Sequence, residues 1–176
     1  LVHLKHILDQ EGIVDTKQKF HRIEAYDVSN TAGQNATVSM VVLTNGEIDQ
    51  SQYKFFKIRS LNTPNDYGML QEALSRRQKH PEWGRPDLIL IDGGKGQIRA
   101  VNKIWQETAP IIGLVKNPDR LVLIKTNSDK KNTLETKTIN LQAEHPTLKM
   151  LQRLRDEAHR FAKKHHTRLR TKNLLQ

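Results

Sequence analysis

The stretch LILID at residues 88–92 constrains the fold more than any other part of the sequence. Its four consecutive apolar residues leave no polar face, and a strand of this kind is usually buried on both faces in the middle of a sheet. Such a sheet needs helices on both of its sides. The run ends in Asp92, and an ionised carboxylate removed from water is costly unless a partner compensates it. Three partners are open: a structural hydrogen bond, a nearby phosphate-binding turn or a metal ion.

Three β-rich segments precede this run, at residues 22–29, 36–43 and 51–60. The turn sequence TAGQN at 31–35 joins the first two, and the Asn-Gly pair of TNGE at 44–47 is a hairpin signal. The three segments therefore predict an antiparallel meander.

The hydrophobic period changes to a helical one after the meander. In chain order the pattern predicts a helix at 63–80, a strand at 85–92, a helix at 95–107, strands at 110–116 and 120–126, and a long helix at 146–172 that opens at Pro146. The polar segment 127–140 is expected to be a flexible loop or an excursion at the sheet edge. Three meandering strands followed by alternating helices and strands predict an α/β protein with a mixed sheet and flanking helices, in the order of the RNase H-like fold.

One domain accounts for nearly all of the 176 residues. Residues 1–20 predict a short helix and a polar connector, and residues 21–172 the RNase H-like domain. No apolar run reaches the roughly 18 residues of a transmembrane helix, and we expect no membrane partner. The absence of cysteine fits a cytoplasmic protein. The chain has no cysteine, so oxygen atoms and imidazole would have to hold any metal. It begins at Leu1, which fits a piece of a longer protein.

The charge of the chain predicts a polyanionic partner. Its 29 Lys and Arg residues exceed its 19 Asp and Glu residues, for a net charge of +10, which favours nucleic acid first and an anionic membrane surface second. Residues 149–172 alone carry nine basic residues and two acidic ones. Lys149, Arg153, Arg160 and Lys164 recur at helical spacing, and such a cationic side is suited to a phosphate backbone.

Two acids stand at the ends of strands that the RNase H-like order makes parallel neighbours. Asp27 and Asp92 would then lie on strands about 4.8 Å apart, and their mutual repulsion favours a hard divalent ion between them. Taken alone, each acid has a more ordinary explanation. Asp92 precedes Gly-Gly and suits a turn, Asp27 suits an Asx-turn, and Asp66 suits a helix N-cap. Two strand-end acids together in so basic a chain favour the metal.

Other polar residues are less decisive on pattern alone. His159 lies at the margin of the apolar stripe of the last helix, where a histidine is more often a hydrogen-bonding residue than a catalyst. Imidazole nevertheless suits proton transfer or metal ligation. The segment GGKGQ lacks the glycine spacing of a P-loop, and no Ser or Thr follows Lys95, so no nucleotide cofactor is predicted.

Three segments closely resemble the C-terminal endonuclease half of the UvrC family, the excinucleases of bacterial nucleotide excision repair. They are RIEAYDVSNTAGQNATVSMVVLTNGE, PDLILIDGGKGQ and LQRLRDEAHRFAKKHHTRLR, and they extend from about Arg22 to Arg170 in the family's order. The resemblance implies an RNase H-like fold that makes the incision 5′ to a DNA lesion with a divalent metal, Mg²⁺ or Mn²⁺.

The resemblance also implies site residues. The Asp-Asp-His triad of the family corresponds to Asp27 in YDVSN, Asp92 in LIDGG and His159 in DEAHR, which would also hold the metal. Asp66 in NDYGML matches a further acid important for incision. Four basic residues are expected to position the DNA backbone without reading bases: Lys95, Arg153, Arg155 and Arg160.

The implied partners are damaged duplex DNA and, in the full-length protein, UvrB. The family's GIY-YIG nuclease half, UvrB-binding segment and helix-hairpin-helix pair do not occur in this chain, so we expect an excised domain. The alternative is a non-catalytic DNA-binding or interaction module on an RNase H-like fold, whose basic helix contacts DNA or an acidic partner.

Overall fold

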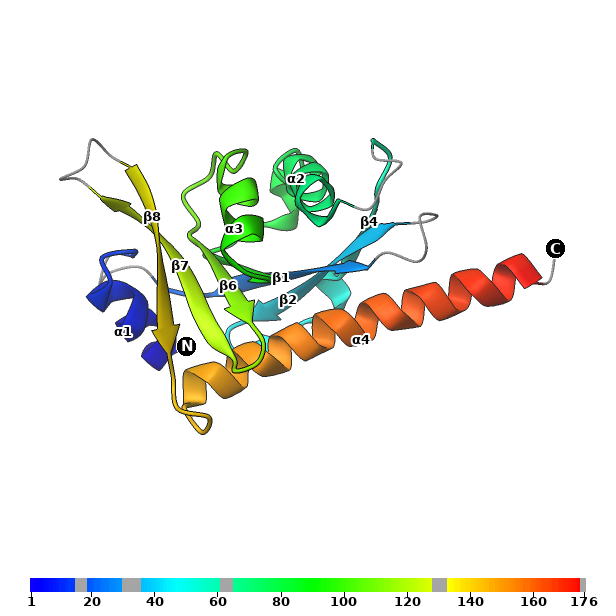
Figure 1. Cartoon of the computed structure of the whole chain (residues 1–176). Coiled ribbons are helices and arrows are strands. Elements are labelled where there is room, and N and C mark those ends of the chain that lie inside the picture. The colour runs from blue at the N-terminus through cyan, green and yellow to red at the C-terminus, as the bar shows by residue number, and fades with distance from the viewer. Residues whose placement is uncertain (15–18, 30–35, 61–64, 128–132, 175–176) are drawn as a thin grey trace.

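The computed structural model describes residues 1–14, 19–29, 36–60, 65–127 and 133–174 (Figure 1). The elements in chain order are α1 (Val2–Gln10), β1 (Arg22–Ser29), β2 (Thr37–Thr44), β3 (Glu47–Ile48), the 3-10 helix η1 (Gln50–Gln52), β4 (Lys54–Lys57), α2 (Asp66–Arg77), the 3-10 helix η2 (Pro81–Trp83), β5 (Leu88–Asp92), α3 (Lys95–Asn102), β6 (Ile111–Val115), β7 (Arg120–Asn127), β8 (Thr133–Asn140) and α4 (Pro146–Leu174). Among the described residues, no helix combines the length and the apolar composition that a bilayer crossing requires.

The strands form one mixed sheet in the order β3-β2-β1-β5-β6-β7-β8, and β4 also pairs with β2. The pairs β1–β5 and β5–β6 are parallel, and the other pairs are antiparallel. The predicted meander followed by parallel strands is confirmed, and with it the RNase H-like class. The predicted Asn-Gly hairpin is also confirmed, since Asn45 and Gly46 have φ angles of 52° and 90°, as a primed turn requires.

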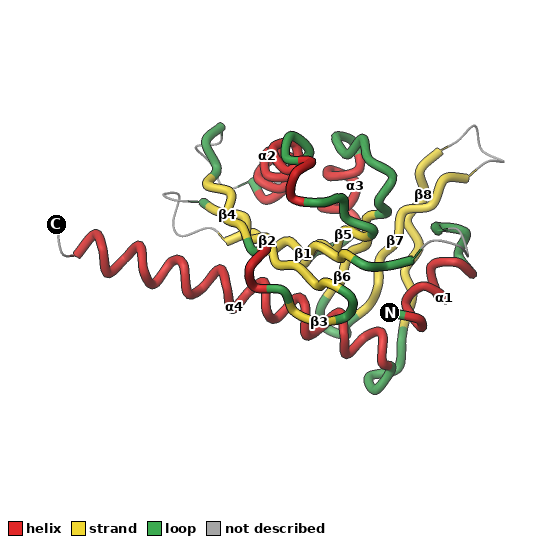
Figure 2. Tube along the Cα trace, turned by 180° about the vertical axis from the view of Figure 1, so that it is seen from behind, coloured by secondary structure: helices red, strands yellow, loops and turns green. Residues whose placement is uncertain are grey.

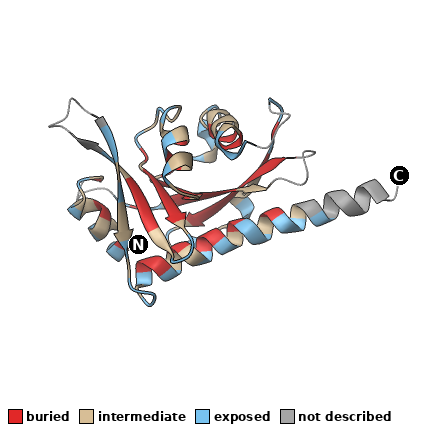
Figure 3. Ribbon diagram, in the orientation of Figure 1, coloured by how far each residue is buried: buried red, intermediate tan, exposed pale blue. Residues whose placement is uncertain are grey.

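Helices cover both faces of the sheet. α2 and α3 lie on one face, and α4 crosses the other beneath β1, β2 and β6, with α1 beside it (Figures 1 and 2). One hydrophobic cluster fills the space between the sheet and α4, and a second fills the space under α2 and α3. Figure 3 shows the central strands as the most buried part of the molecule. The apolar run of β5 is therefore explained by burial on both faces, as predicted.

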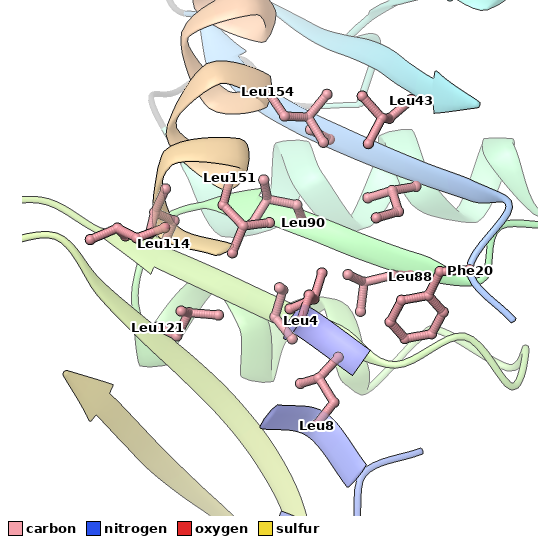
Figure 4. Close-up of a cluster of buried hydrophobic side chains, with 14 of the residues drawn as sticks. Leu4, Leu8, Phe20, Leu43, Leu88, Leu90, Leu114, Leu121, Leu151 and Leu154 are labelled. Atoms are coloured by element: carbon pink, nitrogen blue, oxygen red, sulfur yellow. The ribbon is translucent and has the colours of Figure 1, made fainter. Parts of the chain in front are cut away.

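α1 belongs to the same core as the sheet. Leu4 and Leu8 are fully buried and pack in the cluster that contains Leu88, Leu121 and Leu151 (Figure 4). The division expected at residue 20 falls in the connector between this helix and β1.

Two predicted elements differ from the structure. The third strand, predicted at 51–60, is shorter than expected. Its first two residues belong to η1, whose N-cap Asp49 accepts a hydrogen bond from the backbone N–H of Ser51 at 3.2 Å, and only Lys54–Lys57 form β4. Within the polar segment predicted at 127–140 as a loop or an edge excursion, Thr133–Asn140 form β8, which pairs with β7 along its whole length. β8 is an edge strand, and one partly solvated face accommodates its polar residues. The predicted turn at 31–35 lies outside the described residues.

A buried ion pair ties α2 to the centre of the sheet. Arg77 is 2% exposed, and its Nε and Nη2 atoms donate to the Glu24 carboxylate at 2.8–3.2 Å. Glu24, on β1, also accepts from Arg22 Nε and Tyr26 Oη at 2.7 Å each. Arg77 further donates to the carbonyls of His80 and Gly84. These hydrogen bonds stabilise the fold, because a buried charge that loses its partner is strongly destabilising.

Arg77→Met is expected to lower the free energy of unfolding by about 3–5 kcal/mol, because it leaves the Glu24 carboxylate buried with fewer donors. Urea denaturation at neutral pH measures this loss. The matched control is Arg99→Met at an exposed position of α3, for which a change within about 0.5 kcal/mol is expected. Equal losses in the two variants would contradict a structural role for the buried pair.

Candidate active site

The parallel pairing of β1 with β5 sets the position of the two acids. The paired register ends at Tyr26 opposite Ile91, so Asp27 and Asp92 are the next residues along the two strands. Side chains alternate along each strand, and Tyr26 and Ile91 belong to the cluster beneath α2 and α3. Asp27 and Asp92 consequently project toward the opposite face, which α4 covers.

Asp27 is buried and faces His159. The residue is 7% exposed, and the Nδ1 atom of His159 lies 3.2 Å from its Oδ2. A hydrogen bond from Ser39 Oγ to the carbonyl of Ala158, 3.1 Å long, fixes the neighbouring turn of α4 against β2. Burial raises the pKa of Asp27; the His159 contact lowers it, and repulsion from Asp92 raises it further, so the net pKa lies above the ordinary value.

Asp92 has a different partner. Lys116 Nζ lies 3.1 Å from its Oδ2, and among the described residues no backbone amide donates to this carboxylate. The alternative explanation of Asp92 as a turn-forming residue, which needs such a backbone hydrogen bond, is therefore not supported among the described residues. The turn itself is built by other groups: Gly94 is the N-cap of α3, and its N–H donates to Gln97 Oε1 at 3.0 Å. A Cβ at Gly113 of β6 would collide with the carbonyl of Gly93, so glycine is required for this close approach.

Lys116 is a residue of the candidate site that the sequence analysis did not predict. It follows β6, whose residue Leu114 is paired in register with Asp92. Half of its side chain is exposed, and its charge also lowers the pKa of Asp27. The available signal was a lysine directly after the strand that neighbours LILID.

The chemistry of the donor set fits a divalent cation. Two carboxylates at the end of adjacent strands repel one another, the imidazole is within hydrogen-bond distance of one of them, and a hard cation relieves this repulsion. Across the described residues, however, no three His, Asp or Glu side chains are gathered closely enough to form a complete metal site. Asp92 is instead paired with the Lys116 ammonium through its Oδ2 atom.

Asp66 stands apart from the other acids. It is the first residue of α2, whose N-cap is Asn65, with Oδ1 accepting from the N–H of Gly68 at 3.1 Å. Asp66 is exposed, and no hydrogen bond or ion pair joins its side chain to another described residue. The adjacent Tyr67 packs so closely on Gly96 of α3 that a Cβ there would collide with its ring. This contact fixes the start of α2 beside the start of α3, which follows Asp92.

The four basic residues expected at DNA have different environments. Lys95 is exposed at the first position of α3, three residues after Asp92, and Arg153 is exposed on α4. Arg160 is half exposed and forms a bidentate pair with Glu157 at 2.6 and 2.7 Å.

Arg155 differs from the expectation that it contacts DNA. It is 9% exposed, and its Nη1 donates to Asp119 at 2.8 Å while its Nε donates to Asp156 at 3.1 Å. Gln152 donates to the same Asp119 at 2.6 Å. Arg155 therefore joins α4 to the turn between β6 and β7, because its position on the helix faces the sheet rather than solvent.

Comparison with known proteins gives distant structural likenesses and close sequence relatives. The crystal structure of Endonuclease V from Ciona intestinalis in complex with DNA has a TM-score of 0.46 and 17% identity, over 66% of this chain and 55% of that one. The UvrABC system protein C of Prosthecochloris aestuarii is 41% identical over 161 residues, and that of Fusobacterium nucleatum is 36% identical over 172 residues. These two alignments cover 88% and 97% of this chain.

The alignments cover only 25% and 28% of the length of those two relatives, so the chain corresponds to about a quarter of the longer proteins. The family described as the UvrC RNase H endonuclease domain matches residues 11–162, which include Asp27, Asp92 and His159. The matched span and the identity to the relatives lead to one conclusion: the chain belongs to the UvrC family, as its RNase H endonuclease domain.

Proposed function

We propose that this domain is a metal-dependent DNA endonuclease that hydrolyses a phosphodiester 5′ to a lesion during nucleotide excision repair. The observation that carries the proposal is the register of β1 and β5, which puts Asp27 and Asp92 at the same end of neighbouring strands. The Nδ1 atom of His159 lies 3.2 Å from Oδ2 of Asp27. Among the described residues, each carboxylate is contacted by a side chain and not by a backbone amide: Asp27 by His159 and Asp92 by Lys116.

Asp27, Asp92 and His159 would hold the ion, Mg²⁺ or Mn²⁺. When bound, such an ion supplies an activated water and a polarised phosphoryl oxygen. The alternative to ligation is that His159 moves a proton: it is half exposed, so its second ring nitrogen could exchange a proton with solvent or substrate while Nδ1 stays with Asp27. The Lys116 ammonium, once off Asp92, is a positive charge for the phosphate whose negative charge grows during hydrolysis.

Damaged duplex DNA is the proposed substrate, and Lys95, Arg153 and Arg160 are proposed to contact its backbone. The net charge of +10 supports this proposal. The relatives are named UvrABC system protein C, which supports UvrB as a partner of the longer protein. The cytoplasm is its proposed location. Arg155 is not included, because its guanidinium is held by Asp119 and Asp156.

Mn²⁺ is expected to stabilise the wild-type domain and not Asp27→Asn or Asp92→Asn. At about 100 times the dissociation constant, a ligand that binds only the folded state adds about 2.7 kcal/mol to the free energy of unfolding. Thermal melting with Mn²⁺ or chelator measures the difference. Asp156→Asn, an exposed acid on α4, is the control that should respond like the wild type.

The same aspartate variants should abolish incision in a full-length UvrABC protein C that carries this domain. A non-catalytic DNA-binding module would give the opposite pattern. Salt-sensitive DNA binding would then be insensitive to chelator, Mn²⁺ would stabilise no variant differently, and both aspartate variants would cut as the wild type does.

Relative to Asp27→Asn, the metal-free wild type is expected to lose stability as pH rises above the pKa of an unfolded aspartic acid, about 3.9. The raised pKa of Asp27 means that the folded state holds this proton more tightly than the unfolded state does, so ionisation weakens the fold across the interval between the two values. Asp27→Asn should lack this loss and be the more stable protein near neutral pH in chelator. Urea denaturation between about pH 4 and about pH 7 measures both proteins. If the free energy of unfolding changed with pH in the same way in both proteins, the assignment of this proton to Asp27 would be wrong.

Lys116→Met is expected to bind Mn²⁺ about three- to tenfold more tightly and to support slower incision. The cation competes with the metal for Asp92 but is proposed to contact phosphate in the reaction. Isothermal titration with Mn²⁺ and single-turnover incision measure the two effects separately. Lys103→Met, an exposed lysine at the end of α3, is the control. Unchanged values for both quantities would exclude Lys116 from the site.

A further inference from the structure

A small aromatic pocket lies between α4 and the edge of the sheet, outside the catalytic constellation. Its volume is about 120 Å³, and six of the side chains that line it are Tyr53, Phe55, Arg160, Phe161, Lys164 and His165. The chain has only four Phe and three Tyr residues, so the two Phe and one Tyr gathered here are a substantial part of its aromatic content. None of the three is fully buried.

The rings are arranged as an ordered stack. Phe55 on β4 stacks on Phe161 at 3.9 Å between ring centroids and on His165 at 4.0 Å. Tyr53 meets Phe161 edge-on at 4.9 Å. Phe161 and His165 are four residues apart on α4 and so lie on one face of it, where they present aromatic surface to the pocket.

Cations form the rim of the same pocket. Arg160 and Lys164 are also four residues apart, and both are exposed beside the aromatic pair. Glu157 accepts hydrogen bonds from Arg160 and, at 2.9 Å, from Tyr53 Oη. One carboxylate thus fixes an aromatic wall and a cation together, and this reduces the entropy lost when a ligand binds.

Phe55 of the pocket lies in the same row across the sheet as Asp27, the proposed catalytic acid. Asp27 on β1 is paired in register with Ser39 on β2, and Ser39 is paired with Phe55 on β4. Residues in one row point to the same face, so Asp27 and Phe55 both face α4, separated by two strand spacings or roughly 10 Å. This separation is about three rises of a stacked DNA strand.

We propose that this pocket holds one unpaired nucleobase of the DNA strand that the domain cuts, with Arg160 and Lys164 on its flanking phosphates. Aromatic faces beside a basic rim are the features by which proteins bind single-stranded nucleic acid without reading its sequence. A purely structural aromatic cluster has no need of a cationic rim, and a purely electrostatic surface has no need of stacked rings. The inference rests on the proposed nuclease function for the identity of the strand.

The test uses duplex DNA with a short single-stranded gap that contains 2-aminopurine, whose fluorescence is quenched by stacking. Chelator prevents cleavage. The wild type should bind gapped DNA more tightly than fully paired DNA and quench the probe. Phe161→Leu should weaken binding to gapped DNA about tenfold or more and abolish the quench, and Phe161→Tyr should restore both. Leu134→Ala, at a half-exposed apolar residue on β8, is the control that should change neither.

Lys164→Gln provides an independent test that does not depend on aromatic packing. It should reduce the salt dependence of gapped-DNA binding by about one phosphate contact. A folded Phe161→Leu variant with wild-type affinity and quench would overturn the inference, as would an unchanged salt dependence in Lys164→Gln. The two proposals therefore fail separately: intact incision in Asp27→Asn contradicts the nuclease, and intact stacking in Phe161→Leu contradicts the pocket.

Discussion

The parallel pairing of β1 with β5 is the interaction on which the rest of the molecule depends. It joins the antiparallel meander to the parallel half of the sheet and gives both strands helices on each face. It also brings two acids to the same end of neighbouring strands. A shift of one residue in this register would turn one of them toward α2 and α3, and the candidate site would be lost. The buried pair of Glu24 with Arg77 connects β1 to α2 and holds this strand from the other face.

α4 is the second determinant, because one helix contributes to several sites. Its apolar side closes the core over the sheet, and Arg155 fixes it to the turn after β6. His159 then meets Asp27, while Arg160 and Phe161 line the pocket beside β4. The spacing of these residues along one helix places a histidine at Asp27, two cations at the rim of the pocket and an aromatic ring inside it. A change in how α4 packs on the sheet should therefore affect both the proposed hydrolysis and the proposed DNA contacts.

The sequence was sufficient for the architecture and for the identity of the triad candidates. The apolar run of β5, the Asn-Gly turn and Pro146 of α4 are local signals with a direct physical cause, and they lie where predicted. β8 could not be recognised, because an edge strand with a solvated face has no distinctive apolar pattern. The contact of Lys116 with Asp92 and the burial of Arg155 against Asp119 could not be predicted. Both depend on which residues of neighbouring strands and turns come together in the folded chain. The same holds for the stack of Phe55 on Phe161, since the two residues are far apart in the chain.

The central proposal is that the fold holds the carboxylates of Asp27 and Asp92 close enough for a divalent cation to bind between them. The most direct measurement of this arrangement is the anomalous diffraction of Mn²⁺ in crystals of the domain. We predict one peak that both Asp27 and Asp92 contact at a coordination distance of about 2.1 Å, with Lys116 displaced from Asp92. Ordered carboxylates with no peak between them at saturating Mn²⁺, and Lys116 still paired with Asp92, would contradict it.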